Sequence, residues 1–217
     1  MKTAIVAIVA ELDEPYLKEW IEWHQSIGID DIFVVANNWD WKPTHKNVWS
    51  GRIDGKVKQL PAYNWWLSKL GTTSKYDWAF FIDVDEFIYP GDEGLAALLE
   101  RFKDVEAVGL NWKLFGDSGL QEEGTTCLDR FTKCQKGLNK HVKIALKLPT
   151  NALMNSPHSA GQFCSYVKTV NADGQLFEGP FCESTKWREG MPFIAHFFCK
   201  TFKEYKYRRS FGRADCD

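Results

Sequence analysis

The chain has 217 residues and a formal net charge of −2, and 26% of its residues are charged. This length suits one domain that buries a substantial core, and the near-neutral charge balance predicts no binding to nucleic acid or to a membrane surface. No apolar stretch approaches the roughly 18 residues needed to span a bilayer.

The start of the chain has the pattern of a strand, a helix and a second strand. Residues 3–10 form a β-rich apolar run that stops at Glu11 without a cleavage-like site, so we interpret it as a strand rather than a signal peptide. Pro15 suits the first turn of a helix, apolar side chains then recur at helical spacing, and Gly28 suits the helix end. Residues 31–36 form the next apolar run, and this order predicts a βαβ unit with parallel strands.

The alternation of strands and helices continues to about residue 113 and then becomes irregular. The sequence predicts, in order, a polar loop at 40–55, a strand at 56–60, a helix at 63–70, a buried strand up to 82, a helix at 94–102, a strand at 107–112, a loop at 116–119, an isolated strand at 141–148 and a turn-rich segment at 151–158. We therefore expect one domain, residues 1–217, whose second half, 114–217, covers the sheet built by 1–113 and completes its site.

The most informative segment is an apolar run that changes abruptly into acidic residues. It ends in Asp83, Asp85 and Glu86, three carboxylates within four positions. Acidic residues after a buried strand lie at the edge of the sheet, where open α/β sheets bind ligands. Asp83 and Asp85 can turn toward one divalent cation that also carries a phosphate. The alternative is a capped, solvent-facing strand end.

The spacing alone is a weak signal, because fifteen Asp in 217 residues yield about one Asp-x-Asp by chance. The same spacing recurs in Asp215-Cys216-Asp217, which follows no apolar strand and which we interpret as solvated terminus. The preceding strand therefore distinguishes the first pair.

The six cysteines show no Cys-x-x-Cys pair and no zinc spacing, which favours free thiols in a reducing compartment over a structural metal cluster. We accordingly expect a cytoplasmic protein.

Several segments, in a constant order, resemble nucleotide-sugar glycosyltransferases of the GT-A fold, in particular family 92 and family 2-like relatives. The matching segments are residues 11–24 with 28–29, residues 81–87, residues 111–112 with 115–116 and 118–119, His158, residues 196–200, and residues 207–209 with Gly212. Two positions depart mildly from the pattern: Ala10 replaces the family's Asn, and Thr201 replaces its Ser.

The resemblance implies an α/β fold with a mixed, mostly parallel central sheet flanked by helices, and a metal-dependent transfer of a hexose or deoxyhexose from a UDP-sugar to a glycan or glycoprotein acceptor. In such a reaction a cation stabilises the charge that develops on the leaving diphosphate. Asp85 is the first candidate for metal contact. Asp83 resembles the family acid that reaches the ribose or a metal-bound water, and His196 is the third candidate ligand. An imidazole ligand favours Mn²⁺ over Mg²⁺.

Other residues are candidates for binding the donor. The residues at the ends of the first two strands are candidates for base and ribose contacts: Ala10, Glu11, Asn37 and Asn38. In the basic tail, Lys200 and Arg208 are candidates for contacts with the diphosphate. His158 is a candidate for contact with a sugar. For Glu11 the alternative is a favourable interaction with the helix dipole, for the tail residues a solvated basic helix, and for His196 a core histidine.

The catalytic base is less defined. Asp117 follows the strand after the acidic segment and is the first candidate, with Asp215, Glu122 and Glu123 as rivals. Two other functions stay open. A sugar nucleotidylyltransferase would need a glycine-rich, basic loop after the first strand, which this chain lacks, and a non-catalytic carbohydrate-binding module would use the tryptophans as platforms without needing Asp83 or Asp85. The chain ends soon after the last matching segment, so we expect it to be one domain of a longer protein.

Overall fold

A computed structural model of the chain describes residues 1–73, 75–162 and 165–210. The first half contains, in order, β1 (Thr3–Ala10), a 3₁₀ turn (Glu11–Asp13), α1 (Glu14–Ser26), β2 (Asp31–Asn37), β3 (Val48–Ile53), α2 (Gln59–Leu70), β4 (Trp78–Phe81), β5 (Glu86–Tyr89), α3 (Gly94–Arg101) and β6 (Ala107–Leu114). The second half contains β7 (Val142–Lys147), β8 (Leu153–Ser156), β9 (Ser159–Gln162), β10 (Ser165–Tyr166), β11 (Thr169–Asn171), β12 (Leu176–Phe177), β13 (Phe193–His196) and α4 (Phe202–Ser210).

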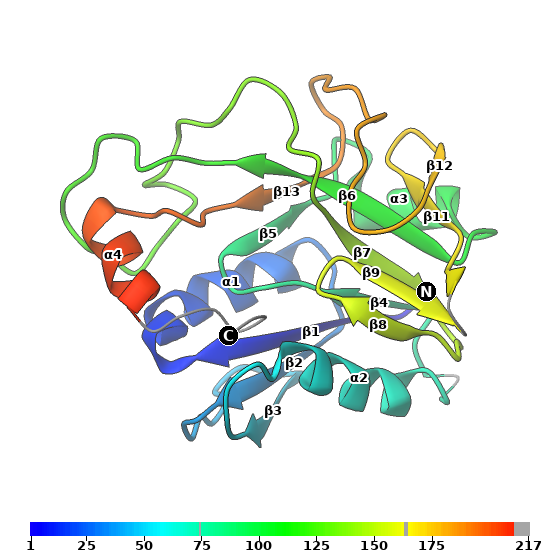
Figure 1. Cartoon of the computed structure of the whole chain (residues 1–217), viewed down its shortest axis with the longest axis horizontal. Helices are drawn as coiled ribbons and strands as arrows, with labels where there is room; N and C mark the ends of the chain where they lie inside the picture. Colours follow the sequence, from blue (N-terminus) through cyan, green and yellow to red (C-terminus); the bar gives the residue numbers. More distant parts are fainter. Residues whose placement is uncertain (74, 163–164, 211–217) are drawn as a thin grey trace.

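One mixed sheet organises the molecule (Figure 1). Its strands lie in the order β12-β11-β6-β7-β4-β1-β2-β3, and β13 pairs with β6 and with β5. The pairs among β1, β2, β3 and β4 are parallel, whereas β7 runs antiparallel to both of its neighbours, β4 and β6. The expected α/β class with a mixed, mostly parallel sheet is thus confirmed.

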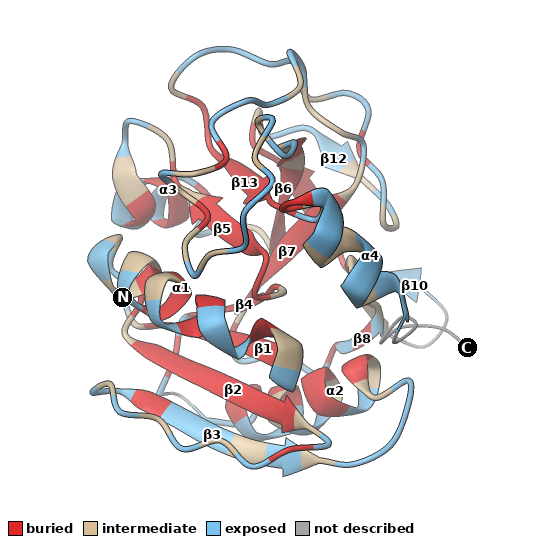
Figure 2. Cartoon of the chain, turned by 90° about the vertical axis from the view of Figure 1, so that its left-hand side faces the viewer, coloured by how far each residue is buried: buried red, intermediate tan, exposed pale blue. Residues whose placement is uncertain are grey.

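Helices cover both faces of this sheet because the central strands are apolar on both sides. Along β1, Ile5, Ala7 and Val9 face a core that contains α1 and α3, while alternate residues face a core that contains α2. Figure 2 shows β1, β2, β5 and β7 buried between these layers. No helix within the described ranges is long and apolar enough to cross a membrane.

The first βαβ unit forms as expected. Pro15 lies in the first turn of α1, and Gly28 follows the helix at a φ of +102°, which a residue with a side chain rarely adopts. The side chain of Glu19 on the outer part of α1 accepts the N–H groups of Cys127 and Leu128, at 2.5 and 3.2 Å. This carboxylate attaches the long segment between β6 and β7 to the helix.

Two expectations about strands are wrong. The strand expected at 56–60 is instead β3, Val48–Ile53, inside the expected polar loop. As an edge strand paired only with β2, it needs few apolar residues, and its Trp49 is 51% exposed, so its pattern is weak. The strand expected to be isolated at 141–148 is β7, which lies inside the central sheet.

The acidic segment continues into a strand that the sequence did not predict, because Glu86–Tyr89 forms β5 and pairs with β13. Cys127, Cys134, Cys182 and Cys199 are free thiols, as expected, whereas Cys164 and Cys216 lie outside the described residues.

Candidate active site

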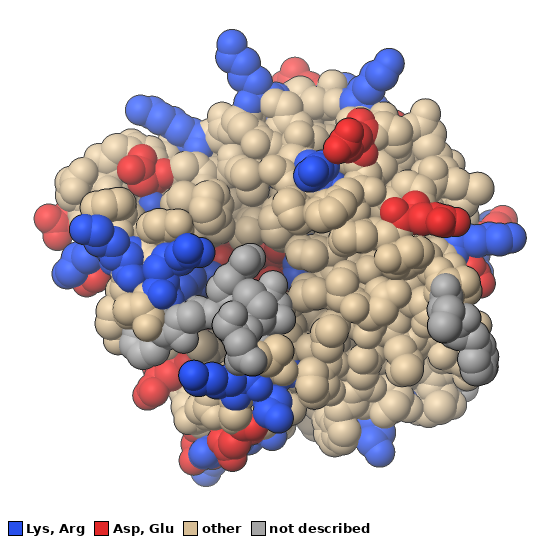
Figure 3. Space-filling model, viewed as in Figure 1, with Lys and Arg blue, Asp and Glu red and all other residues tan. Residues whose placement is uncertain are grey.

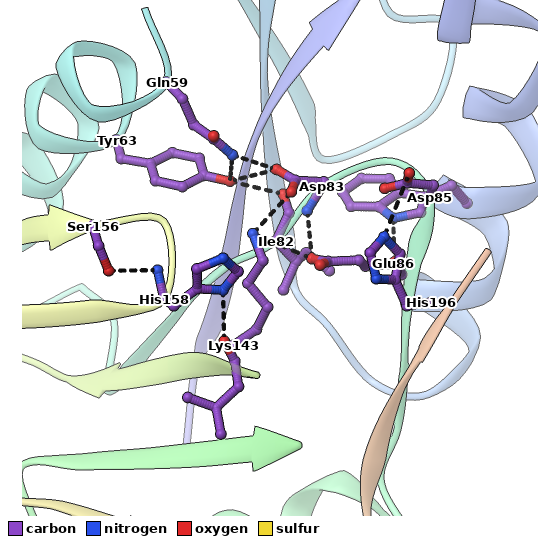
Figure 4. A network of polar contacts seen from close by, with 12 residues as sticks. Gln59, Tyr63, Ile82, Asp83, Asp85, Glu86, Lys143, Ser156, His158 and His196 are labelled. Carbon is purple, nitrogen blue, oxygen red and sulfur yellow. Dashed lines mark hydrogen bonds and ion pairs between the residues drawn. The ribbon is translucent and has the colours of Figure 1, made fainter. Parts of the chain in front are cut away.

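Asp83 and Asp85 follow β4 at the carboxyl end of the parallel strands, and their side chains point in different directions (Figure 4). Asp83 points toward α2 and β7, and Asp85 toward β13 and α4. The chain turns between them and continues directly into β5. The two carboxylates therefore meet different partners.

Asp83 is held by three side chains. Gln59 Nε2 and the Tyr63 hydroxyl donate to Oδ1 at 2.6 and 3.0 Å, and Lys143 Nζ donates to Oδ2 at 2.9 Å. The Asp83 side chain keeps one third of its surface exposed, whereas the Lys143 side chain has none. Hydrogen bonds from Gln59, Tyr63 and Lys143 thus fix the carboxylate, while its exposed part stays open to solvent. This arrangement suits an acceptor of a ligand hydroxyl.

Glu86 completes the group around Lys143. Its Oε2 accepts the backbone N–H of Asp83 at 2.9 Å and lies 3.4 Å from Lys143 Nζ. Its Oε1 is buried and has no hydrogen-bond partner among the described residues. Burial raises the pKa of Glu86 to about 7, although Lys143 opposes this shift.

Asp85 lies between two segments from the end of the described chain. Arg208 Nη1 on α4 donates to Asp85 Oδ2 at 2.5 Å, and His196 Nε2 at the end of β13 lies 3.6 Å from the same oxygen. Asp85 is only 3% exposed, and burial opposes its ionisation. Arg208 and His196 outweigh that effect and hold the pKa of the Asp85 carboxyl well below its usual range.

Arg208 and a second cation, Lys200, also reach the start of α1. Arg208 Nη2 donates to Oδ1 of Asp13, and Lys200 Nζ lies 3.4 Å from that oxygen and 3.7 Å from the centre of the Tyr16 ring. Lys200 is 5% exposed. The alternative of a fully solvated basic helix is therefore wrong for Lys200 and Arg208. Figure 3 shows further basic side chains gathered over α4, beside a hollow in which acidic atoms are visible.

An aromatic cluster borders the site on its other side. The ring of Trp112 on β6 lies 4.1 Å from that of His196, 5.1 Å from that of His158 and 4.8 Å from that of His141, measured between centroids. His158 Nδ1 donates to the carbonyl of Val142 at 2.8 Å, and burial, with the nearby Lys143, lowers the His158 pKa to about 4. His158 is therefore neutral at pH 7, with Nε2 as a hydrogen-bond acceptor.

Other sequence candidates lie farther along the sheet edge. The side chains of Asn37 and Asn38 hold the segment after β3, where Asn37 donates to Ile53 and Gly55 and Asn38 accepts the N–H of Gly55. Ala10 ends β1 opposite Asn37, and Glu11 is exposed at the start of the 3₁₀ turn.

Asp117 lies in an exposed turn, where its carboxylate accepts the N–H of Gly119 at 2.9 Å. Asp215 and Gly212 lie outside the described residues. The structure thus brings Asp83, Asp85, His158, His196, Lys200 and Arg208 to one region, while Asp117, Asn37 and Asn38 have structural contacts of their own.

Sequence reasoning missed four residues of the site: Gln59, Tyr63, Lys143 and Asp13. The sequence does contain an indication that Lys143 belongs to a site, since this lysine interrupts the otherwise apolar run of residues 142–146 in a strand. A lysine buried in a strand needs an acidic partner. Asp13 lies within the matching segment 11–24 but carried no signal of its pairing with Lys200 and Arg208.

No known family model matches this chain. A glycosyltransferase family 92 protein of Arabidopsis thaliana is 24% identical over 177 residues, covering 66% of this chain and 29% of that protein. A glycosyltransferase family 92 protein of Oryza sativa subsp. japonica is 28% identical over 105 residues, covering 43% of this chain and 18% of that protein. The chain therefore spans less than a third of the length of these curated relatives.

Among solved structures, residues 1–349 of S. aureus TarS in complex with UDP match with a TM-score of 0.41 and 14% identity, over 56% of this chain and 38% of TarS. HddC from Yersinia pseudotuberculosis matches with a TM-score of 0.39 and 12% identity, over 89% of this chain and 76% of HddC. The sequence matches confirm what the ordered segments indicated: the chain is similar to glycosyltransferase family 92 proteins.

Proposed function

We propose that the chain is the catalytic domain of a glycosyltransferase that moves a sugar from a UDP-sugar to a glycan or glycoprotein acceptor with a divalent cation, Mn²⁺ or Mg²⁺. The observation that carries the proposal is the position of Asp85. It is a buried, ionised carboxylate at the end of a parallel strand, and it faces an imidazole and two cations. The similarity to family 92 glycosyltransferases supports a transferase.

The side chains around Asp85 fit a cation that is shared with a substrate. Asp85 Oδ2 and His196 Nε2 lie 3.6 Å apart and would offer an oxygen and a nitrogen to one ion. Within the described ranges no three His, Cys, Asp or Glu side chains form a cation site by themselves. Mg²⁺ commonly takes one or two carboxylates plus substrate phosphates. Such an ion would act as a Lewis acid toward the leaving diphosphate.

The chain's own residues would then bind and orient the donor. Lys200 and Arg208 would contact phosphate oxygens, and the exposed edge of Asp83 would accept a ribose hydroxyl while Lys143 holds it in place. His158 Nε2 would accept a sugar hydroxyl. Residues 1–113 would supply the acidic residues and the nucleotide contacts, and residues 114–217 would supply the cations that complete the donor site, together with the acceptor side.

The remaining nucleotide assignments follow the resemblance. The residues at the ends of β1 and β2 would contact uracil and ribose: Ala10, Glu11, Asn37 and Asn38. The role of Asp117 does not follow from the resemblance. It is the first candidate for the base because it is an exposed acid that follows β6, with Asp215 as its rival. A nucleotidylyltransferase is disfavoured, because the turn after β1 contains neither glycine nor lysine.

The test is a panel of nucleotide sugars with Mn²⁺, in which nucleotide release is measured with and without candidate acceptors. UDP at about 100 times its Kd should stabilise the fold by about 2.7 kcal/mol, and only when Mn²⁺ is present. Asp85→Ala should abolish transfer and this stabilisation, whereas Asp104→Ala, at an exposed acid outside the site, should preserve both. A protein that responds to no nucleotide would contradict the proposal.

A further inference from the structure

A series of aromatic rings leads from Asp85 to the protein surface. His196 contacts Trp112, Trp112 stacks on His141 at an interplanar angle of 19°, and His141 meets the Phe181 ring edge to face at 4.8 Å. Exposure rises along the series from 9% at His196 to 44% at Phe181. A ring of this size exposed at the end of a continuous aromatic series offers a flat apolar surface close to the site.

The backbone fixes Phe181 in that position. Residue 181 forms an isolated antiparallel bridge with residue 141, Cys182 donates to the carbonyl of Lys140 at 2.7 Å, and Val142 donates to that of Pro180 at 3.4 Å. In Figure 1 this segment follows β12 and runs beside the start of β7. Phe181 thus belongs to a segment anchored on the strand that also carries Lys143.

One charged side chain lies over part of the exposed ring, and a second charged side chain pairs with the first. Lys140 Nζ lies 4.9 Å from the centre of the Phe181 ring and 4.0 Å from Glu183 Oε1. Both side chains are more than half exposed, so they offer a hydrogen-bond donor and an acceptor beside an apolar face. A pyranose has the complementary surface, with C–H groups on its faces and hydroxyls at its rim.

The order of the strands separates this surface from the donor side. The proposed nucleotide contacts lie at β1 and β2, the aromatic series starts at β6 and β7, and β4 with its acidic residues lies between them. A sugar on Phe181 would therefore approach Asp85 from the side opposite the nucleotide. His158 also contacts Trp112, with the two ring centroids 5.1 Å apart.

We infer that Phe181, with Lys140 and Glu183, forms the subsite that binds a sugar unit of the acceptor, and that stacking on Phe181 determines which acceptors are used. This inference rests on the proposed function, and it concerns a residue that neither the sequence segments nor the relatives' names assign. Phe181 binds and orients the acceptor and takes no part in bond breaking.

The experiment measures sugar binding and donor use separately. Saturation-transfer NMR with lactose, maltose, cellobiose and N-acetyllactosamine should detect at least one bound sugar in the wild type. Phe181→Ala should weaken its binding about tenfold, and Phe181→Tyr should restore it. Trp65→Ala removes a ring on α2 that is 54% exposed, somewhat more than Phe181, and should leave binding unchanged. Circular dichroism at 25 °C confirms that each variant is folded.

Donor hydrolysis without acceptor is measured for the same variants. Unchanged UDP release in Phe181→Ala together with lost sugar binding supports the inference. Normal UDP release with no sugar bound, or with equal sugar binding in wild type and Phe181→Ala, overturns the inference and leaves the proposed function standing. Absent UDP release in the wild type contradicts the proposed function instead.

Discussion

Arg208 donates a hydrogen bond to Asp85 at 2.5 Å although the two residues are 123 positions apart. The contact attaches α4 to the carboxylate that follows β4, and the other arm of the guanidinium binds Asp13. The protein thus neutralises its own candidate metal ligand with a side-chain cation. A divalent ion at the same oxygen would have to compete with Arg208.

We therefore expect Arg208→Gln to have opposite effects on two ligands. It should bind Mn²⁺ alone about tenfold more tightly, because the competing charge is removed. It should bind UDP less tightly, because a cation for the diphosphate is lost. Isothermal titration with each ligand separates the effects, and Arg209→Gln, an exposed neighbour on α4, serves as control. Mn²⁺ binding that is unchanged or weaker would show that Arg208 does not compete with the ion.

Lys143 is the second buried cation, and its removal should mainly affect stability. Lys143→Met would leave Asp83 and Glu86 without their counter-charge in a buried setting, and we expect a loss of about 3–5 kcal/mol of unfolding free energy. Adding Glu86→Gln should recover part of this loss, because one buried charge is then removed. Urea unfolding of the two single variants and the double variant at pH 7.5 gives the coupling free energy between Lys143 and Glu86. Purely additive effects would exclude the proposed interaction.

Because of the buried His24, we expect the unfolding free energy of the protein to fall in acid. Its Nδ1 donates to the carbonyl of Trp20 and its Nε2 accepts the N–H of Ile88, so the fold requires the neutral ring. Burial lowers the His24 pKa from 6.5 to about 3. Between these pH values the unfolded chain binds the extra proton, and stability therefore decreases as the pH falls. The decrease should be about 2 kcal/mol from pH 6.5 to 5 for this residue.

The matching measurement is urea unfolding at several pH values for the wild type and His24→Gln. Glutamine retains a donor and an acceptor but does not titrate. The unfolding free energy of the variant should therefore depend less on pH, by the contribution of about one proton. His158, with its pKa near 4, acts in the same direction and remains in both proteins. Identical slopes would mean that His24 does not stay neutral in the fold.

Glu19 should control the order of the segment between β6 and β7. Glu19→Ala would leave the N–H groups of Cys127 and Leu128 without their acceptor, at a cost of about 1–3 kcal/mol. Glu19→Gln keeps one acceptor oxygen and should cost less. Hydrogen exchange of the two amides is the direct readout, and protection equal to that of the wild type in Glu19→Ala would disprove the attachment.

The parts of the fold that follow from local pattern were predictable. Residues 3–10 have an unbroken apolar run and form β1, and the same holds for β4, Trp78–Phe81, which precedes Asp83. The strand β3 was not predictable, because at the edge of the sheet its residues need no apolar pattern. The central place of β7 also stayed hidden, because it depends on contacts between segments about 65 residues apart.

The residues of the candidate site likewise divide into those that local sequence pattern predicts and those that it does not. Asp83 and Asp85 stand out because acidic residues follow a buried strand. Their partners do not, since Lys143 and Arg208 come from distant elements, and a basic helix looks alike in sequence whether its charges are solvated or paired. The roles assigned to Asn37, Asn38 and Asp117 remain predictions.

The interleaving of β7 between β4 and β6 has a practical consequence for anyone who wishes to shorten this protein. A fragment that stops at residue 113 would leave β4 with an uncovered edge and would lack the ammonium group that balances Asp83. Such exposed edges recruit other chains. We expect this fragment to accumulate in inclusion bodies, because the donor side of the molecule is completed by a strand from the opposite half of the chain.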